Sequence, residues 1–386
     1  MCFLTPKKPL YTTKIIWLLP ALLFCISSPN SGLAITDVKT NFVNMWISSN
    51  KNLFLTMVTN PASFPQPAHK HGSHQPVMLE QVLDAIAPKE GELIVDGTLG
   101  AGGYTRAIVQ KASCRIYAID RDPGAIELAQ HWLGNWPNIK ILHGNFGDAE
   151  TLLAAQNINK IDGIVFDLGV SSMQLDQAER GFSFRHDAPL DMRMSQEGPC
   201  AADIINEMKE EELANLIYKY GEERKSRAVA KAIVAARKHS PINRTTELAD
   251  IVRSVVRSAP SKGIDPATRT FQALRIFVNN ELGELERGLV AAKQLLSPGG
   301  RLVVISFHSL EDRIVKHFIR DNSGQSGSGY SRYFPESVTV AQRKAAFFKQ
   351  QSGRAIVPMQ EELRFNPRAR SARLRVAIRT GEFFQA

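Results

Sequence analysis

The chain has 386 residues, which is enough for two domains or for one domain with a large insertion. Its 44% hydrophobic and 22% charged residues exclude a wholly disordered protein. The net charge of +9 favours a polyanionic partner such as nucleic acid, although a merely solubilising surface would carry it too. None of the four cysteines forms a Cys-x-x-Cys pair, so neither a zinc site nor a disulfide framework is indicated, which suits a reducing compartment.

The N-terminal 60 residues differ from the rest of the chain. Three lysines precede the apolar run 15–26, a pattern typical of a secretory signal peptide and short for a membrane span. The chemistry indicated further along the chain requires a cytosolic cofactor and substrate. We therefore expect this segment, 1–60, to be signal-like or spurious, with 1–56 an upstream extension or a dispensable leader and Met57 a later start. The protein is then expected to be cytoplasmic.

Residues 70–175 alternate short apolar runs with helical patterns, which predicts the first part of a parallel, doubly wound α/β sheet. The expected strands are 93–96, 115–120, 139–143 and 161–167. The second part of the sheet domain is expected at 284–386. It would comprise a helix at 289–296, a turn at 297–300, a strand at 301–306, and an antiparallel edge strand at 374–379.

The intervening residues, 176–283, contain no strand-like run. Apolar residues recur there at helical spacing, which predicts an inserted all-helical domain that recognises the substrate. The expected helices are 213–220, 224–239, a third that starts at 246, and a fourth with Pro266 in its first turn. The basic residues of this region could equally form a solvated helix face.

A loop with four glycines follows the first expected strand and leads into a helix. Glycine lets a backbone approach a ligand closely, and a helix N-terminus offers free N–H groups. The pattern is not the dinucleotide fingerprint, and glycines at such a turn can also serve packing alone.

Three further side chains follow the next strands, at the sheet edge where open α/β sheets bind ligands. Asp120 lies at the spacing where a carboxylate can accept hydrogen bonds from both ribose hydroxyls, although it could also cap a helix. Phe146 could pack on an adenine ring or be an ordinary core residue. Together with Asp167, after the fourth strand, they favour an adenosine-containing cofactor.

The segment Asp167-Leu-Gly-Val-Ser-Ser172 occupies the position of the target-base motif in amino-methylating enzymes. The lone pair of an exocyclic amine is delocalised into its ring, so the amine is a poor nucleophile. A carboxylate such as Asp167 can accept its N–H hydrogens and align the lone pair for in-line attack on a sulfonium methyl group. A nicotinamide-dependent oxidoreductase would share the ribose-binding Asp120 and stays open as an alternative. A non-catalytic RNA-binding factor that kept the fold is a third possibility.

Ten segments taken in chain order are more specific than any single motif. They are His74-x-Pro-Val-x-x-Glu80, Asp96-Gly-Thr-x-Gly-x-Gly-Gly103, Ala118-Ile-Asp-Arg-Asp-Pro123, Asp167-Leu-Gly-Val-Ser-Ser172, Gly181-Phe-Ser-Phe184, Pro189-Leu-Asp-Met-Arg193, Tyr220-Gly-Glu-Glu223, Ala267-Thr-Arg-Thr-Phe-Gln-Ala273, Ser306-Phe-His-Ser-Leu-Glu-Asp-Arg313 and Asn366-Pro-Arg-Ala-Arg-Ser371. From about His74 to Arg379 the chain closely resembles the bacterial small-subunit ribosomal RNA methyltransferase H family, also called the MraW family.

The resemblance implies a class I, Rossmann-like methyltransferase sheet with an inserted helical domain. It implies methylation, dependent on S-adenosyl-L-methionine, of N4 of a cytidine in the decoding region of 16S rRNA, within the small ribosomal subunit or its precursor. It implies Asp167 as the catalytic residue and no metal. The implied cofactor-binding residues are Gly102, Gly103, Tyr104, Asp120, Phe146, Asp167 and Gln174.

Other residues carry weaker assignments. Many family members have His where this chain has Tyr104, and we expect that residue to line the cofactor largely through its backbone. Residues 191–193, Arg269 with Gln272, and 308–313 are expected to border the substrate cleft, although His308 could instead make a structural hydrogen bond. Three arginines could bind phosphate or form surface ion pairs. They are Arg368, Arg370 and Arg373.

Overall fold

The computed structural model describes residues 76–256, 265–324 and 346–381. The signal-like segment, Met57 and the first motif residue His74 lie outside these ranges. Within them, no helix is both long enough and apolar enough to cross a membrane.

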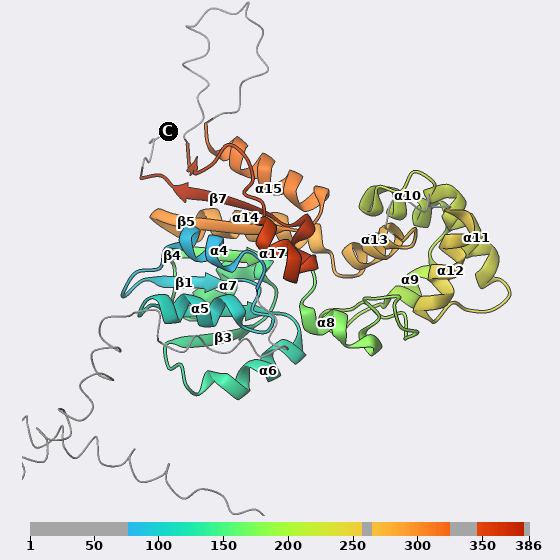
Figure 1. The fold of residues 1–386 in the computed structure, drawn as a ribbon, viewed down its shortest axis with the longest axis horizontal. Coiled ribbons are helices and arrows are strands. Elements are labelled where there is room, and N and C mark those ends of the chain that lie inside the picture. The colour runs from blue at the N-terminus through green and yellow to red at the C-terminus, as the bar shows by residue number, and fades with distance from the viewer. Residues whose placement is uncertain (1–75, 257–264, 325–345, 382–386) are drawn as a thin grey trace, which may run out of the picture. The chain divides into compact units, whose positions relative to one another are not determined.

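The described residues form a seven-stranded sheet with the order β3-β2-β1-β4-β5-β7-β6 (Figure 1). Its strands are β1 Leu93–Asp96, β2 Arg115–Asp120, β3 Ile139–His143, β4 Ile161–Asp167, β5 Leu296–Ser306, β6 Phe348–Gln350 and β7 Arg373–Arg379. Strands β1 to β5 pair in parallel, and β7 pairs antiparallel with both β5 and β6. The doubly wound α/β prediction and the four strands before the helical segment are confirmed. The central strands β1 and β4 are almost wholly buried, as central parallel strands are, whereas the edge strand β3 exposes Lys140 and His143.

Two expectations about the last strands were wrong. The predicted turn at 297–300 belongs to β5, where the pairing with β4 shifts register between Ile161 and Gly163. The predicted edge strand at 374–379 lies inside the sheet, because the three-residue strand β6 pairs with its outer side. Five of its residues are buried and a sixth is half-buried. Alternation with arginine suggested a half-exposed strand, but the Arg375 side chain is only 7% exposed and bonds Asp312 from inside the protein.

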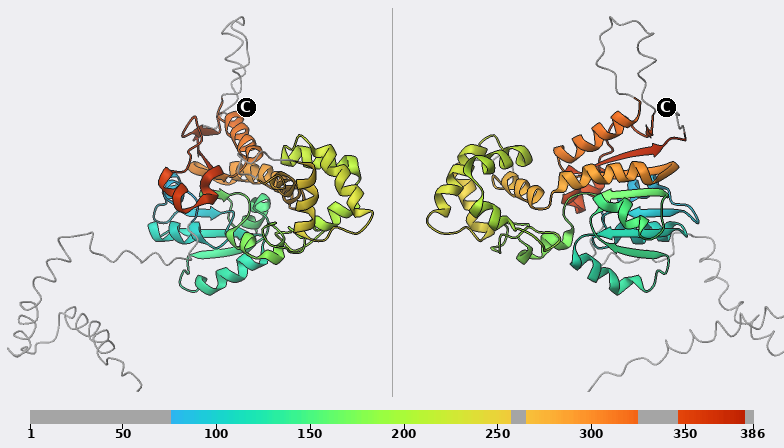
Figure 2. Two further views of the ribbon diagram at one scale, coloured as in Figure 1. Left: turned by 45° about the vertical axis from the view of Figure 1, so that its right-hand side comes forward. Right: turned by 180° about the vertical axis from the view of Figure 1, so that it is seen from behind.

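Helices cover both faces of the sheet and bury two separate apolar cores. One core takes side chains from α4 Leu79–Ile86, α5 Gly103–Lys111 and α6 Pro123–Leu133. The opposite core takes them from α7 Ala149–Ala154, α14 Glu281–Leu295 and α15 Ser309–Asn322, which face the viewer in the back view of Figure 2. Short segments complete this part of the chain. They are η2 Phe146–Asp148, α17 Gln360–Phe365 and η5 Pro367–Ser371.

Helices fill the described residues between β4 and α14. They are α8 Ser172–Asp176, η3 Ala178–Arg180, α9 Ala201–Glu207, α10 Glu210–Gly221, α11 Ser226–Arg237, α12 Thr245–Val255 and α13 Thr268–Val278. They share a third apolar core, and the bridge between Pro189 and Arg244 is the one β pairing described among them. Helix α13 begins at Thr268, two residues after Pro266. The autonomy of this segment as an inserted domain stays a prediction.

Candidate functional site

A cavity of about 620 Å³ lies at the carboxyl ends of the five parallel strands. Its walls come from the glycine loop after β1, the ends of β2 and β3, the segment 167–172 after β4, and the residues that follow β5. Six of the seven residues proposed for the cofactor line it, namely Gly103, Tyr104, Asp120, Phe146, Asp167 and Gln174. Gly102 is not among the lining residues, and its cofactor role stays a prediction.

The glycine loop is shaped by backbone bonds and by close packing. The Gly100 N–H donates to Asp120 Oδ2 at 2.8 Å, which ties the loop to the end of β2. A Cβ at Gly102 would lie 2.2 Å from the Trp132 ring, at a φ of +74° that disfavours other residues. A Cβ at Gly103 would lie 2.3 Å from Pro76. Both glycines therefore let α5 start close against its neighbours.

Asp120 offers a carboxylate with spare capacity on both oxygens. Its Oδ1 accepts from the Asp122 N–H at 2.9 Å, and its Oδ2 accepts from Gly100. Each oxygen keeps a second lone pair, so a pair of neighbouring hydroxyls could still bind to it. Burial raises the pKa of Asp120, against the two backbone hydrogen bonds that lower it.

Phe146 presents a fixed aromatic ring at the same end of the cavity. Its centroid lies 5.0 Å from that of Phe166, with the ring planes 41° apart. A Cβ at Gly288 would come within 2.6 Å of the ring, so the glycine makes room for it. This position can pack a planar ring from a ligand.

Asp167 ends β4 and carries an unsatisfied oxygen. Its backbone N–H donates to Thr98 Oγ1 at 2.7 Å, while its Oδ1 is buried without a hydrogen-bond partner among the described residues. Burial, followed by the charges of Asp96 and Glu311, raises the pKa of Asp167 well above its usual value. A buried acceptor without a hydrogen bond costs free energy of folding. This oxygen is therefore expected to accept a hydrogen bond from a ligand.

Asp96 does not line the cavity, but its charge acts on Asp167, and the sequence did not single it out. It is fully buried at the end of β1 and accepts from the Thr98 N–H at 3.1 Å and from the Thr105 hydroxyl at 2.6 Å. Burial raises its pKa to about 6. The sequence signal that could have found Asp96 was its place at the start of the Asp-Gly-Thr motif. The sequence alone does not show that the last residue of a strand is buried.

The side-chain polar groups of Gln174 and Tyr104 form hydrogen bonds within the protein. Gln174 Nε2 donates to Asp122 Oδ2 at 2.7 Å, and its Oε1 accepts from the Ser171 N–H at 3.0 Å, so it holds the loop after β4 in place. The Tyr104 hydroxyl donates to the Val77 carbonyl, and burial raises its pKa well above its usual value. Tyr104 is therefore unsuited to act as a base, and its contact with a cofactor stays a prediction.

Several residues expected at the substrate cleft do not line the cavity. Asp191 and Arg193 bond each other, with 2.7 Å between Oδ2 and Nη2. Arg269 donates to the Glu222 carbonyl and Gln272 to the Tyr220 carbonyl, so these two hold α13 against α10. Their expected contact with substrate stays a prediction.

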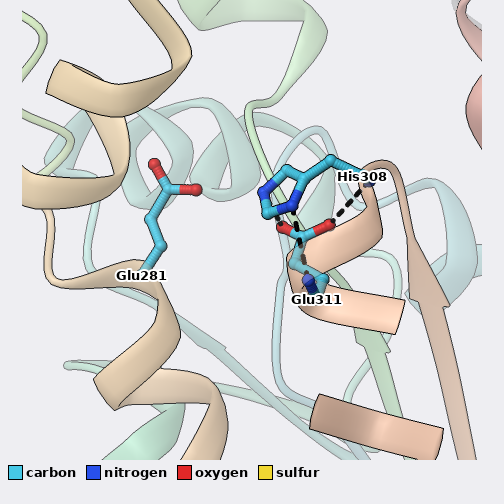
Figure 3. A group of neighbouring side chains, drawn as sticks. All are labelled: Glu281, His308 and Glu311. Atoms are coloured by element: carbon cyan, nitrogen blue, oxygen red, sulfur yellow. Dashed lines mark hydrogen bonds and ion pairs between the residues drawn. The ribbon is translucent and has the colours of Figure 1, made fainter. Parts of the chain in front are cut away.

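His308 makes the structural hydrogen bond that the sequence left as an alternative. It caps α15, with its Nδ1 accepting from the Glu311 N–H at 3.3 Å and its Nε2 lying 3.2 Å from Glu311 Oε1 (Figure 3). Although burial raises it, the pKa of Glu311 lies below its usual value because His308 and Arg275 outweigh burial.

Glu281 lies across from this pair, and ligand atoms of Glu281, His308 and Glu311 fall within 4.8 Å of one another (Figure 3). Arg275 already bonds both oxygens of Glu281 at 2.8 Å. Nδ1 of His308 accepts from the Glu311 N–H, while its Nε2 has no hydrogen-bond partner among the described residues. Because both Glu281 oxygens and Nδ1 of His308 are already engaged, the arrangement favours a hydrogen-bonded network over a metal centre.

Two of the three arginines near the C-terminus form ion pairs. Arg368 bonds the Ser172 hydroxyl and lies 2.9 Å from Asp176 Oδ1. Arg373 lies 3.9 Å from Asp312, whereas Arg370 is exposed. Arg368 also lines the cavity, next to the segment that follows β4.

Comparison with known proteins identifies the family of this chain. Residues 71–380 match the family described as the MraW methylase family. The chain belongs to this family. It is 55% identical over 309 residues to the ribosomal RNA small subunit methyltransferase H of Rhodospirillum rubrum, over 80% of this chain and 94% of the relative. It is 54% identical over 319 residues to the protein of that name from Paramagnetospirillum magneticum, over 82% of this chain and 96% of the relative.

Within this MraW-family chain, seven of the ten segments that carried the sequence resemblance contribute residues to the cavity wall. The glycine loop, the end of β2 and the segment after β4 all contribute to its walls. Four residues of the Asn366–Ser371 segment, which contains η5, contribute as well. The residues that match the family model therefore include all the described residues that line the cavity.

Proposed function

We propose that this MraW-family protein methylates N4 of one cytidine in the decoding region of 16S rRNA, with S-adenosyl-L-methionine as the methyl donor. The observation that carries the proposal is the buried, unpartnered Asp167 Oδ1 at the wall of a cavity that also contains Asp120. The names of the relatives support ribosomal RNA of the small subunit as the substrate. A cytosolic substrate and cofactor would place the protein in the cytoplasm.

The cavity fits the proposed cofactor. Asp120 can accept hydrogen bonds from both ribose hydroxyls, and Phe146 can pack on the adenine. The glycine loop lines the cavity beside the N-terminus of α5, where the remainder of the molecule would lie. The bound cofactor supplies an electrophilic methyl group on a sulfonium.

Asp167 would act on the amine of the cytosine. Its free Oδ1 can accept an N–H hydrogen and so orient the nitrogen lone pair toward the methyl group. Its raised pKa makes the carboxylate a stronger base than an exposed aspartate, which suits acceptance of the proton that the amine releases. Asp96 lies close enough to raise that pKa further, and Thr98 fixes the backbone of Asp167. The chain's own contribution is thus positioning and proton acceptance in a buried place.

Transfer of a labelled methyl group to purified small subunits tests the proposal. Subunits from a strain that lacks this protein should accept label from S-adenosyl-L-methionine, and digestion should release it as N4-methylcytidine. Calorimetric titration of the protein with S-adenosyl-L-methionine and, separately, with NAD distinguishes this proposal from an oxidoreductase. Binding of NAD alone would overturn it, and binding of RNA without methyl transfer would favour a non-catalytic factor.

A further inference from the structure

The register of β4 and β5 places one aromatic side chain next to Asp167. Asp167 lies opposite Ile305, and the Leu168 N–H donates to the Ile305 carbonyl at 3.0 Å. Side chains two residues apart on a strand share one face of the sheet. Phe307 follows the end of β5 directly and packs against the core that contains Val165 and Ile305, which is the face of the sheet that Asp167 shares.

Gly169 leaves the ring of Phe307 uncovered from its side. A Cβ at this glycine would lie 3.7 Å from Phe307 Cδ2, so a longer side chain there would lie against the ring. Gly169 also has a φ of +93°, a conformation that other residues rarely adopt. The ring is half-buried and lines the cavity.

A hydrogen bond to a buried carboxylate fixes the backbone of Phe307. Its N–H donates to Glu311 Oε2 at 2.8 Å, and Glu311 is 2% exposed in the first turn of α15. Because His308 also bonds Glu311, the start of α15 and the end of β5 form one rigid corner. A ring on such a corner is preorganised for contact with a planar ligand.

Of the described residues that line the cavity, three carry aromatic side chains. Tyr104 donates its hydroxyl to the Val77 carbonyl and is buried. Phe146 packs against Phe166 at the end of the cavity where Asp120 lies. The segment 168–171 after Asp167 supplies no aromatic residue, which leaves Phe307 as the ring beside the reacting position.

We propose that Phe307 is a substrate-positioning residue on which the target cytosine stacks while Asp167 accepts its amine hydrogen. This proposal rests on the proposed function, because it requires a base in the cavity. Enzymes that act on a base extrude it from its stack and hold it between aromatic or apolar side chains. Stacking restricts the base to a plane, so the amine lone pair meets the methyl donor in one orientation.

The test compares Phe307→Leu and Phe307→Tyr with a matched control. Phe318→Leu removes the same ring from α15, but on the opposite core of the sheet and away from the cavity. The readouts are kcat/KM for small subunits and the dissociation constant of S-adenosyl-L-methionine. We expect Phe307→Leu to lower kcat/KM about 10- to 100-fold, as loss of base stacking does, with cofactor affinity unchanged. Phe307→Tyr should stay within about threefold of the wild type.

The outcomes separate this inference from the proposed function. Equal kcat/KM for Phe307→Leu and the wild type overturns the stacking role alone, as does an equal loss in Phe318→Leu. A wild-type protein that transfers no methyl group overturns the proposed function, and this inference with it. Wild-type cofactor affinity shows that the cavity of a variant is intact. If Phe307→Leu fails that criterion, Phe307→Met takes its place, because its flexible apolar side chain can fill the space without a ring.

Discussion

The hydroxyl of Thr98, in the loop after β1, accepts a hydrogen bond of 2.7 Å from the backbone N–H of Asp167, at the end of β4. The bond connects two neighbouring parallel strands at their carboxyl ends, where the cavity begins. The backbone of Thr98 in turn donates to Asp96. Thr98 thus sets the position from which the Asp167 carboxylate enters the cavity.

Replacement of Thr98 by valine should slow methyl transfer about tenfold at saturating cofactor. The variant keeps the shape of the side chain but leaves the Asp167 N–H without an acceptor, at a cost of about 1–3 kcal/mol. Cofactor affinity should stay within about threefold, and Thr98→Ser should restore the rate because it restores the hydroxyl. Single-turnover rates measure the effect. Equal rates for the valine and serine variants would show that the bond does not position Asp167.

Asp167→Asn should lower the single-turnover rate by about 10²- to 10⁴-fold, the usual contribution of a positioned acid or base. The amide has a similar shape but cannot accept the proton that the amine loses. Calorimetry should still detect cofactor binding. Unchanged turnover in this variant would remove the mechanism proposed here.

Asp120→Ala should act on binding rather than on the transfer step. Loss of hydrogen bonds to a charged acceptor costs about 1.5–3 kcal/mol, which corresponds to about a 10- to 100-fold weaker complex with S-adenosyl-L-methionine. At saturating cofactor the rate should stay within about threefold of the wild type. A variant with normal affinity would place the ribose elsewhere in the cavity.

The rate of methyl transfer should depend on pH through Asp167. The carboxylate accepts the proton only when ionised, and its pKa is raised well above the usual value, mainly by burial. The rate should therefore fall with decreasing pH at a higher pH than the ordinary aspartate value of about 4. A single-turnover pH profile checks this, with the residual rate of Asp167→Asn as the reference. A rate that stays constant down to about pH 4 would contradict the role of Asp167.

Gly102→Ala should destabilise the protein, whereas Gly134→Ala should not. At Gly102 the added methyl group would lie 2.2 Å from the Trp132 ring, at a φ of +74°. Overpacking of this kind costs about 1–3 kcal/mol. Gly134 has a helical φ of −56° and open space around its Cα. Urea unfolding compares the two variants, and equal midpoints would show that the loop adapts freely.

The sequence predicted the parallel strands well because each is a short run, rich in apolar residues, that ends at a polar residue. It also predicted β7 as an antiparallel strand but placed it wrongly at the edge of the sheet, and it gave no sign that Arg375 is buried. Its charge is instead neutralised inside the protein by Asp312, a partner 63 residues away in the chain. Strand β6 was missed because three residues carry too little pattern.

The candidate site was predicted in part. Asp120, Phe146 and Asp167 were identified because each follows a strand, and parallel strands bring their carboxyl ends together. The burial of Asp96 and the place of Phe307 depend on strand register and on packing between distant segments. Arg269 and Gln272 also bond the chain at the C-terminal end of α10, a role that the sequence did not predict, and their expected contact with substrate stays a prediction.

The central claim is tested most directly by mapping methylated cytidines in 16S rRNA from a strain that lacks this protein. The account predicts that N4 methylation is lost at one cytidine of the decoding region. It should return on complementation with the wild-type chain and not with Asp167→Asn. Methylation that persists in the deletion strain, or that the Asp167→Asn chain restores fully, would contradict it.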